Sequence, residues 1–214
     1  MVHVYMANIE NLPDPLEVPK IMEGLSEERK KKIVRYKMVS GRKQSLGAGL
    51  LLKEALVRHG ARENDVYVDE YGKPQVKGLC FNLSHSHNIV VCAVSNELVG
   101  CDVEQECSSG KEKIAERFFS KGEVSYLKKK PENFVRVWTL KESYVKMTGE
   151  GLRLPLDCFE IRLEGHPEVY KDGMLCDCFV KEYEILGYRM AVCAKESDFA
   201  AKIENVILAK NGDS

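Results

Sequence analysis

Apolar and polar residues follow two different periods along the chain, and these periods predict where strands and helices lie. Val2 to Ile9 alternates in the manner of a strand. Three prolines between residues 13 and 19 then break the chain, and Ser26-Glu27-Glu28 is typical of a helix start. We expect one helix from there to about Tyr36. A second is expected from about Gly41 to His59, where apolar residues recur at helical spacing.

The middle of the chain has the pattern of short strands. Val66 to Val68 predicts a strand, and Tyr71-Gly72-Lys73-Pro74 is typical of a turn. Ile89 to Val94 and Leu98 to Glu104 are rich in Val and Cys, as strands with a buried face are. Since only Ser95-Asn96-Glu97 separates them, we predict that these two strands form a hairpin.

The segment Cys107-Ser108-Ser109-Gly110 is the most linker-like stretch. We place a boundary there, between an N-terminal half of residues 1–106 and a C-terminal half of residues 107–214. Helices are predicted over 111–119, 121–130 and 133–147, the last ended by the glycines at 149 and 151, with short strands and turns after them. Val91-Cys92-Ala93 recurs as Val192-Cys193-Ala194, which fits two similar halves.

The composition is that of a soluble globular protein and argues against several classes. Of 214 residues, 44% are hydrophobic, and 32 Lys and Arg against 33 Asp and Glu argue against a general nucleic-acid coat protein. The longest apolar run, Ile89 to Val94, is far shorter than the roughly 18 residues of a membrane helix, and the N-terminus lacks a signal-peptide pattern. We therefore expect a cytoplasmic protein without nucleic-acid or membrane partners. Its eight cysteines are expected to be reduced thiols rather than disulfides or metal ligands.

Gly100-Cys101-Asp102-Val103-Glu104 places two carboxylates two positions apart on a predicted strand. Asp102 and Glu104 therefore share a face, while Cys101 and Val103 point the other way. Two neighbouring carboxylates repel each other unless a cation lies between them, and all-oxygen ligands suit Mg²⁺ or Ca²⁺. For this pattern taken alone, a solvated strand face is the alternative.

The predicted helix that contains Trp138-Thr139-Leu140-Lys141-Glu142-Ser143-Tyr144-Val145-Lys146 supplies a second candidate. Glu142 and Lys146 lie one turn apart and share a face. Taken alone, they are most simply an exposed ion pair worth about 0.2–0.5 kcal/mol.

Two features favour anion binding. Ser84 and His85, within Phe81 to His87, offer a hydroxyl and an imidazole just before a buried strand. Residues 20–43 contain nine Lys and Arg but three acidic residues. A solvated helix face explains part of this charge, and a site for a phosphorylated ligand explains its concentration.

In order and spacing, these segments resemble the motifs of the 4′-phosphopantetheinyl transferase superfamily, and of its larger Sfp-like class. The similarity covers nearly the whole chain. Cys101 stands where Ile or Val is usual, His87 where a small residue is common, and Lys43, beside Arg42, where Arg is usual. The matching segments are Tyr71-Gly72-Lys73-Pro74, Phe81-Asn82-Leu83-Ser84-His85-Ser86, Gly100-Cys101-Asp102-Val103-Glu104, Arg117-Phe118-Phe119-Ser120 with Glu123, residues 138–146, and Gly149-Glu150-Gly151-Leu152.

The resemblance implies an α+β fold of two similar subdomains related by a pseudo-two-fold axis, with the active site between them, in a monomer. It also implies an enzyme, a holo-[acyl-carrier-protein] synthase. Such an enzyme transfers 4′-phosphopantetheine from coenzyme A to a serine of an apo acyl, peptidyl or aryl carrier protein and releases adenosine 3′,5′-bisphosphate. The carrier and its pathway stay open.

The resemblance also implies roles for individual residues. Asp102, Glu104 and Glu142 would hold Mg²⁺, and Glu142 or a water on the metal would take the serine proton. Lys146 would neutralise the leaving phosphate. The remaining implied contacts are with coenzyme A: Ser84 and His85 to the phosphates, Lys73 and Pro74 along the adenine, and Lys31 with Lys43 (or Arg42) to the 3′-phosphate.

Two other functions fit parts of the pattern. A module that binds coenzyme A without turnover needs the basic region but not three convergent carboxylates. A metal-dependent phosphohydrolase needs the carboxylates but acts without a carrier protein. Incubation with apo carrier protein, coenzyme A and Mg²⁺ separates all three.

Overall fold

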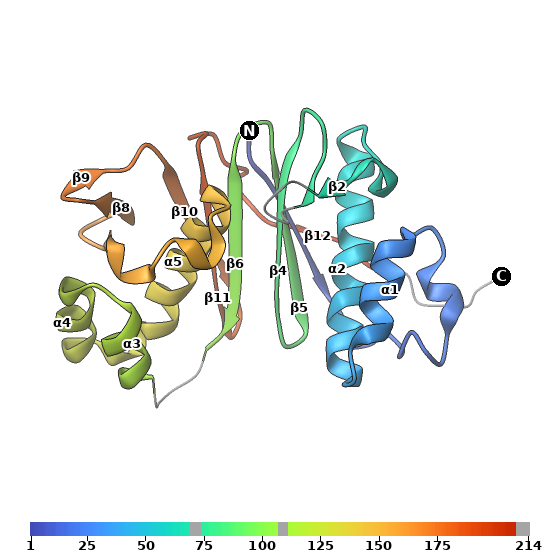
Figure 1. Ribbon diagram of the computed structural model, residues 1–214, viewed down its shortest axis with the longest axis horizontal. Coiled ribbons are helices and arrows are strands. Elements are labelled where there is room, and N and C mark those ends of the chain that lie inside the picture. The colour runs from blue at the N-terminus through green and yellow to red at the C-terminus, as the bar shows by residue number, and fades with distance from the viewer. Residues whose placement is uncertain (69–73, 107–110, 209–214) are drawn as a thin grey trace.

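The computed structural model contains two large sheets that lie between helices (Figure 1), together with two small sheets. It describes residues 1–68, 74–106 and 111–208. The predicted linker at 107–110, and the predicted turn at 71–74 apart from Pro74, lie outside the described residues. The strands are β1 (His3–Asn8), β2 (Tyr67–Val68), β3 (Pro74–Gln75), β4 (Cys80–Ser86), β5 (Ile89–Ser95), β6 (Val99–Gln105), β7 (Phe159–Arg162), β8 (Glu168–Lys171), β9 (Met174–Leu175), β10 (Phe179–Ile185), β11 (Tyr188–Ala194) and β12 (Glu204–Asn205). The α-helices are α1 (Glu27–Arg35), α2 (Val39–Arg58), α3 (Glu112–Phe118), α4 (Lys121–Lys129) and α5 (Phe134–Thr148).

The two larger sheets repeat one topology. In chain order, β1, α2, β4 and β5 are matched by β6, α5, β10 and β11. The first strand of each set pairs antiparallel with the last, which also pairs with the one before it, so the strand orders are β1-β5-β4 and β6-β11-β10. The two Val-Cys-Ala segments lie in β5 and β11, the middle strands of these sets. The predicted mixed α+β class is confirmed.

The core of the described residues comprises four apolar clusters. Three of them lie between the stacked layers of helix and sheet, and the fourth lies among α3, α4 and α5. One cluster lies between α2 and the sheet of β1 and β5, and includes Leu52, Cys92 and Val94. A second lies between the two sheets and includes Val91 and Val192, and a third lies between α5 and its sheet. Both faces of β5 are therefore covered, which explains why all seven of its residues are buried.

The predicted helices are confirmed because their end signals act locally. The Ser26 hydroxyl accepts a hydrogen bond from the Arg29 amide at 3.3 Å, which caps the start of α1. Helix α5 ends at Gly149, whose φ of 75° is the left-handed conformation that glycine adopts most easily.

The predicted pairing of the strands at 89–94 and 98–104 is wrong, although both strands exist. Strand β5 pairs with β1 and β4, whereas β6 pairs with β11, so the chain passes from one sheet to the other between them. The actual hairpin is β4–β5, and it turns at His87 with a φ of 48°. Glycine, which has no Cβ atom, adopts such a conformation with less strain than histidine does.

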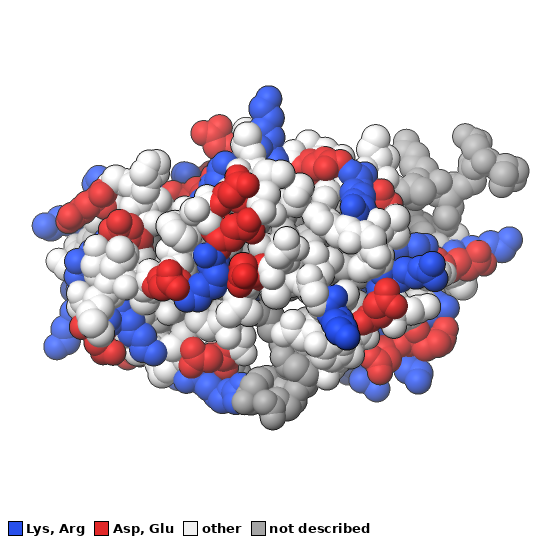
Figure 2. Space-filling view, turned by 90° about the horizontal axis from the view of Figure 1, so that it is seen from above, with Lys and Arg blue, Asp and Glu red and all other residues white. Residues whose placement is uncertain are grey.

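The surface agrees with a near-neutral chain. Figure 2 shows Lys, Arg, Asp and Glu intermixed on one face, without a large area of one sign. In the described part of the chain, no helix is both long and apolar enough to span a membrane. The seven described cysteines are free thiols, as predicted.

Candidate active site

A polar cleft of about 290 Å³ lies where β4, β6 and α5 meet. Strand β4 contributes Ser84 and His85, and strand β6 contributes Asp102 and Glu104. The structure thus gathers six predicted site residues into one cavity. The complete lining is Leu83, Ser84, His85, Asp102, Glu104, Trp138, Glu142 and Lys146.

A close approach of α5 to β6 brings these groups together. Gly100 lies under the helix, and a Cβ atom there would lie 2.2 Å from both the Met147 amide nitrogen and the Ser143 carbonyl oxygen. Only glycine allows this separation. Since Cys101 and Val103 face the core between the sheets, Asp102 faces α5 on the opposite side of the strand.

Asp102 is the most buried carboxylate of the cleft, with 3% of its surface exposed. Its Oδ1 atom accepts hydrogen bonds from the Ser84 hydroxyl at 2.8 Å and from the Lys146 ammonium at 2.5 Å. Lys146 therefore reaches across to β6, and its interpretation as half of an exposed pair on α5 is wrong. Burial alone would lower the pKa of Lys146, but the charge and hydrogen bond of Asp102 outweigh it and raise the pKa.

The carboxylates crowd one another. Burial, followed by the charge of Asp102, raises the pKa of both Glu104 and Glu142. The Oδ2 atom of Asp102 is buried and has no hydrogen-bond partner among the described residues.

These observations test whether the cleft suits a magnesium ion. Asp102 offers a carboxylate oxygen without a partner among the described residues, and the charges of Glu104 and Glu142 are crowded against it. Carboxylate oxygens that crowd one another in this way are the ligands that a hard cation prefers. As the side chains stand, no three His, Cys, Asp or Glu groups within residues 1–68, 74–106 and 111–208 are arranged to hold a metal. The chemistry of the donors fits, and the side chains would have to close around the ion.

Ser84 lies within β4 and not in a loop before a strand. Its hydroxyl donates to Asp102 and accepts from the Lys146 ammonium at 3.0 Å and the Val103 amide at 3.4 Å. A hydroxyl has one proton and two lone pairs, so this group is fully used. Partial burial, followed by the charge of Lys146, lowers the pKa of the neighbouring His85.

The two neighbouring residues predicted to contact a 3′-phosphate, Arg42 and Lys43, have different surroundings. The Arg42 guanidinium holds Asp14 at 2.8 Å and also donates to two backbone carbonyls, so it anchors the segment before α2. This hydrogen bond lowers the pKa of Asp14 to about 2. The Lys43 ammonium donates to the Glu10 carbonyl at 2.7 Å from an exposed position.

Helix α1 presents a lysine that the sequence analysis missed. Lys31 and Lys32 are both exposed, and the charge of Lys31 acts on Glu27. Lys32 is among the charges that lower the pKa of His85, so its charge acts toward the cleft. Helical periodicity could have separated these neighbours, which lie about 100° apart around the axis. Pro74 is exposed at the start of β3, and Lys73 lies outside the described residues.

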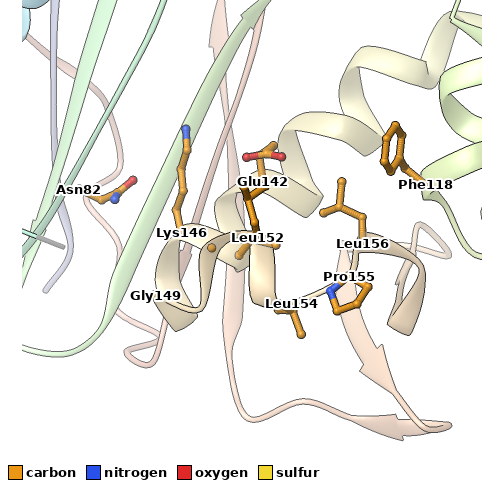
Figure 3. Close-up of a pocket in the computed structure, with 11 residues that line it drawn as sticks. Asn82, Phe118, Glu142, Lys146, Gly149, Leu152, Leu154, Pro155 and Leu156 are labelled. Atoms are coloured by element: carbon orange, nitrogen blue, oxygen red, sulfur yellow. The ribbon is translucent and has the colours of Figure 1, made fainter. Parts of the chain in front are cut away.

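An apolar cavity of about 430 Å³ adjoins the polar cleft, and Glu142 and Lys146 belong to both. Figure 3 shows Asn82 on one side of this cavity and Phe118 on the other, with the two charged residues between them. The rest of its wall is Val145, Gly149, Gly151, Leu152, Leu154, Pro155 and Leu156.

Side chains of β4 join it to β6, because the two strands lie side by side without a backbone ladder in the described structure. Backbone amides of β6 donate to alternate residues of β4. The bonds are Cys101 N to Asn82 Oδ1 at 3.0 Å, Val103 N to Ser84 Oγ at 3.4 Å, and Gln105 N to Ser86 Oγ at 3.1 Å. We call these three residues of β4 the polar seam. The alternation Asn82, Ser84, Ser86 was the signal for it.

The repeated topology and the cleft of carboxylates and lysine define a class of enzyme that comparison identifies. Residues 98–193, from just before β6 to Cys193 in β11, match the sequence model of the 4′-phosphopantetheinyl transferase superfamily. The chain is 35% identical over 204 residues to the 4′-phosphopantetheinyl transferase Sfp of Bacillus subtilis (strain 168), covering 89% of this chain and 91% of that protein. The chain therefore belongs to the 4′-phosphopantetheinyl transferase superfamily and is a transferase.

Two further relatives support this assignment. The 4′-phosphopantetheinyl transferase gsp of Aneurinibacillus migulanus is 33% identical over 205 residues, covering 91% of this chain and 86% of that protein. The 4′-phosphopantetheinyl transferase HetI of Nostoc sp. is 43% identical over 82 residues, covering 35% of each chain. The resemblance to Sfp-like enzymes is confirmed.

Proposed function

We propose that this chain transfers the 4′-phosphopantetheine group of coenzyme A to a serine hydroxyl of an apo acyl, peptidyl or aryl carrier protein. The observation that carries the proposal is the convergence of Asp102, Glu104, Glu142 and Lys146 in one cleft. In the reaction, the serine oxygen bonds to the phosphorus nearer the pantetheine. The bond from that phosphorus to the bridging oxygen breaks, and adenosine 3′,5′-bisphosphate leaves.

This transfer needs positioning and charge stabilisation, which the cleft residues supply. Asp102, Glu104 and Glu142 would hold Mg²⁺, which when bound offsets the negative charge of the diphosphate. Lys146 neutralises the phosphate that leaves. Glu142 is the proposed base, and its raised pKa makes it a better proton acceptor than an ordinary carboxylate.

The two adjoining cavities fit the two parts of coenzyme A. The polar cleft accepts the diphosphate beside His85 and Lys146, and the apolar cavity accepts the uncharged pantetheine arm. The Ser84 hydroxyl donates its only proton to Asp102. It can therefore donate a hydrogen bond to a phosphate only if it gives up its bond to Asp102. Lys32, Lys43 and Lys31 are the proposed contacts of the 3′-phosphate, and Lys73 and Pro74 those of the adenine.

We further propose that the chain is a cytoplasmic monomer with two similar halves related by a pseudo-two-fold axis. The matched strand orders of β1-β5-β4 and β6-β11-β10 support the similarity. The division into residues 1–106 and 107–214 stays a prediction. The pairing of β6 with β11 crosses this boundary, because β6 belongs to the first range and β11 to the second.

The test is incubation of the chain with an apo carrier domain, coenzyme A and Mg²⁺, followed by mass spectrometry of the carrier. We expect one added phosphopantetheine on the carrier serine and one equivalent of adenosine 3′,5′-bisphosphate. A carrier whose serine is replaced by alanine is the control. Hydrolysis of coenzyme A without carrier modification would favour a phosphohydrolase, and binding without either product a non-catalytic module.

A further inference from the structure

The polar seam links backbone geometry to the carboxylates of the cleft. Two of its members are serines. Each accepts a hydrogen bond from a β6 amide and donates one to the carboxylate of the residue directly before that amide. Ser84 bonds to Asp102, and Ser86 bonds to Glu104, with 3.0 Å between Ser86 Oγ and Glu104 Oε2. Two serines that lie two positions apart on β4 therefore bond to two carboxylates that lie two positions apart on β6.

The chemistry of a hydroxyl fixes the direction of these bonds. Ser86 accepts from the Gln105 amide and has one proton to donate, and Glu104 is the charged acceptor within reach. His87 Nδ1 lies farther away, at 3.5 Å. Ser86 is itself 8% exposed, so water competes little for this proton.

We propose that Ser86 is a positioning residue that holds one oxygen of Glu104 and leaves the other for the metal ion. The proposal rests on the proposed function, in which Glu104 is a ligand. Glutamate has one more rotatable bond than aspartate, and Glu104 is less buried than Asp102, so its orientation depends more on such a tie. Removing a partner that orients a metal ligand typically lowers metal affinity about 10–100-fold.

Ser95 offers a matched control at the far end of the neighbouring strand β5. Its buried hydroxyl donates to Glu196 Oε2 at 2.9 Å and accepts from the Glu97 amide at 3.2 Å. Ser95→Ala thus removes the same two kinds of hydrogen bond as Ser86→Ala, but away from the cleft.

The experiment measures Mn²⁺ binding in the presence of coenzyme A, by the electron paramagnetic resonance signal of free Mn²⁺, together with urea unfolding. We expect Ser86→Ala to lower Mn²⁺ affinity about 10–100-fold and Ser95→Ala to leave it unchanged, with similar shifts in urea midpoint. Ser86→Thr, which keeps the hydroxyl, restores affinity. If the threonine variant does not fold, the two alanine variants decide the question.

Three results would overturn the proposal: unchanged Mn²⁺ affinity in Ser86→Ala, an equal loss in Ser95→Ala, or weaker coenzyme A binding in Ser86→Ala without metal and no change in Mn²⁺ affinity. The last result would show that Ser86 contacts coenzyme A directly. Carrier modification by the wild-type chain is measured separately. Normal transfer with unchanged Mn²⁺ affinity refutes only the role of Ser86, whereas a lost affinity without wild-type transfer refutes only the proposed function.

Discussion

Gly100→Ala should damage both the fold and the chemistry, because Gly100 sets the distance between β6 and α5. The added Cβ would lie 2.2 Å from two backbone atoms of the helix, whereas ordinary contact begins at 3.4 Å. Backbone cannot rotate away as a side chain can, so α5 must retreat by about 1.2 Å, the difference between these two distances. Overpacking of this kind typically costs about 1–3 kcal/mol in the free energy of unfolding.

The larger effect is expected on the rate of transfer. Glu142 and Lys146 move with α5 while Asp102 stays on β6, and a misplacement of about 1 Å costs about 10²-fold in rate. The assay is single-turnover transfer at saturating coenzyme A, beside urea unfolding. Gly47→Ala is the control, since its Cβ would meet the Ile9 side chain, 2.4 Å away, at the other helix–sheet contact. A wild-type transfer rate in Gly100→Ala would refute the reasoning.

Three further outcomes are expected. Lys146→Ala should lower the single-turnover rate about 10²–10³-fold, as loss of one preorganised donor at a developing charge does, and a wild-type rate would contradict this. In calorimetry, Lys32→Ala should weaken the binding of coenzyme A by about 1.5–3 kcal/mol but not that of 3′-dephospho-coenzyme A. Lys30→Ala, which removes an ammonium that pairs with Glu27 on the same helix, is the control. If the binding of both ligands is weakened equally, Lys32 attracts them through its charge at long range and does not contact the 3′-phosphate. Asp102→Asn should lower the pKa of Glu142, because the charge of Asp102 helps to raise it, and ¹³C nuclear magnetic resonance titration of the metal-free protein measures this shift. An unchanged pKa would show that burial alone raises it.

Elements with local signals could be predicted from the sequence. The capping serine of α1 and the terminal glycine of α5 lie within the elements they define, so the predicted helices agree with the structure to within about two residues. The period of two in β6 placed Asp102 on the face opposite Cys101, as the structure confirms.

Pairing between distant segments could not be read in the same way. Both faces of β5 are buried, so its uniform apolar pattern does not indicate a partner, and a short turn before β6 favoured a hairpin. The true partner of β6 is β11, about 90 residues farther along the chain. Lys146 was open to interpretation as a surface residue for the same reason, since its partner Asp102 lies on another element.

The first strand of the chain pairs with segments that lie about 200 residues later. Val2 donates its amide to the Asp198 carbonyl at 2.7 Å, and β12 pairs in parallel with β1 through Tyr5 and Glu204. During synthesis, this edge of β1 therefore stays uncovered until residues 204 and 205 have been made. Contacts of such large sequence separation slow folding, because the chain must order a long loop before they form. A chain that ends before these residues exposes an unpaired strand edge, which can pair with the edge of another chain.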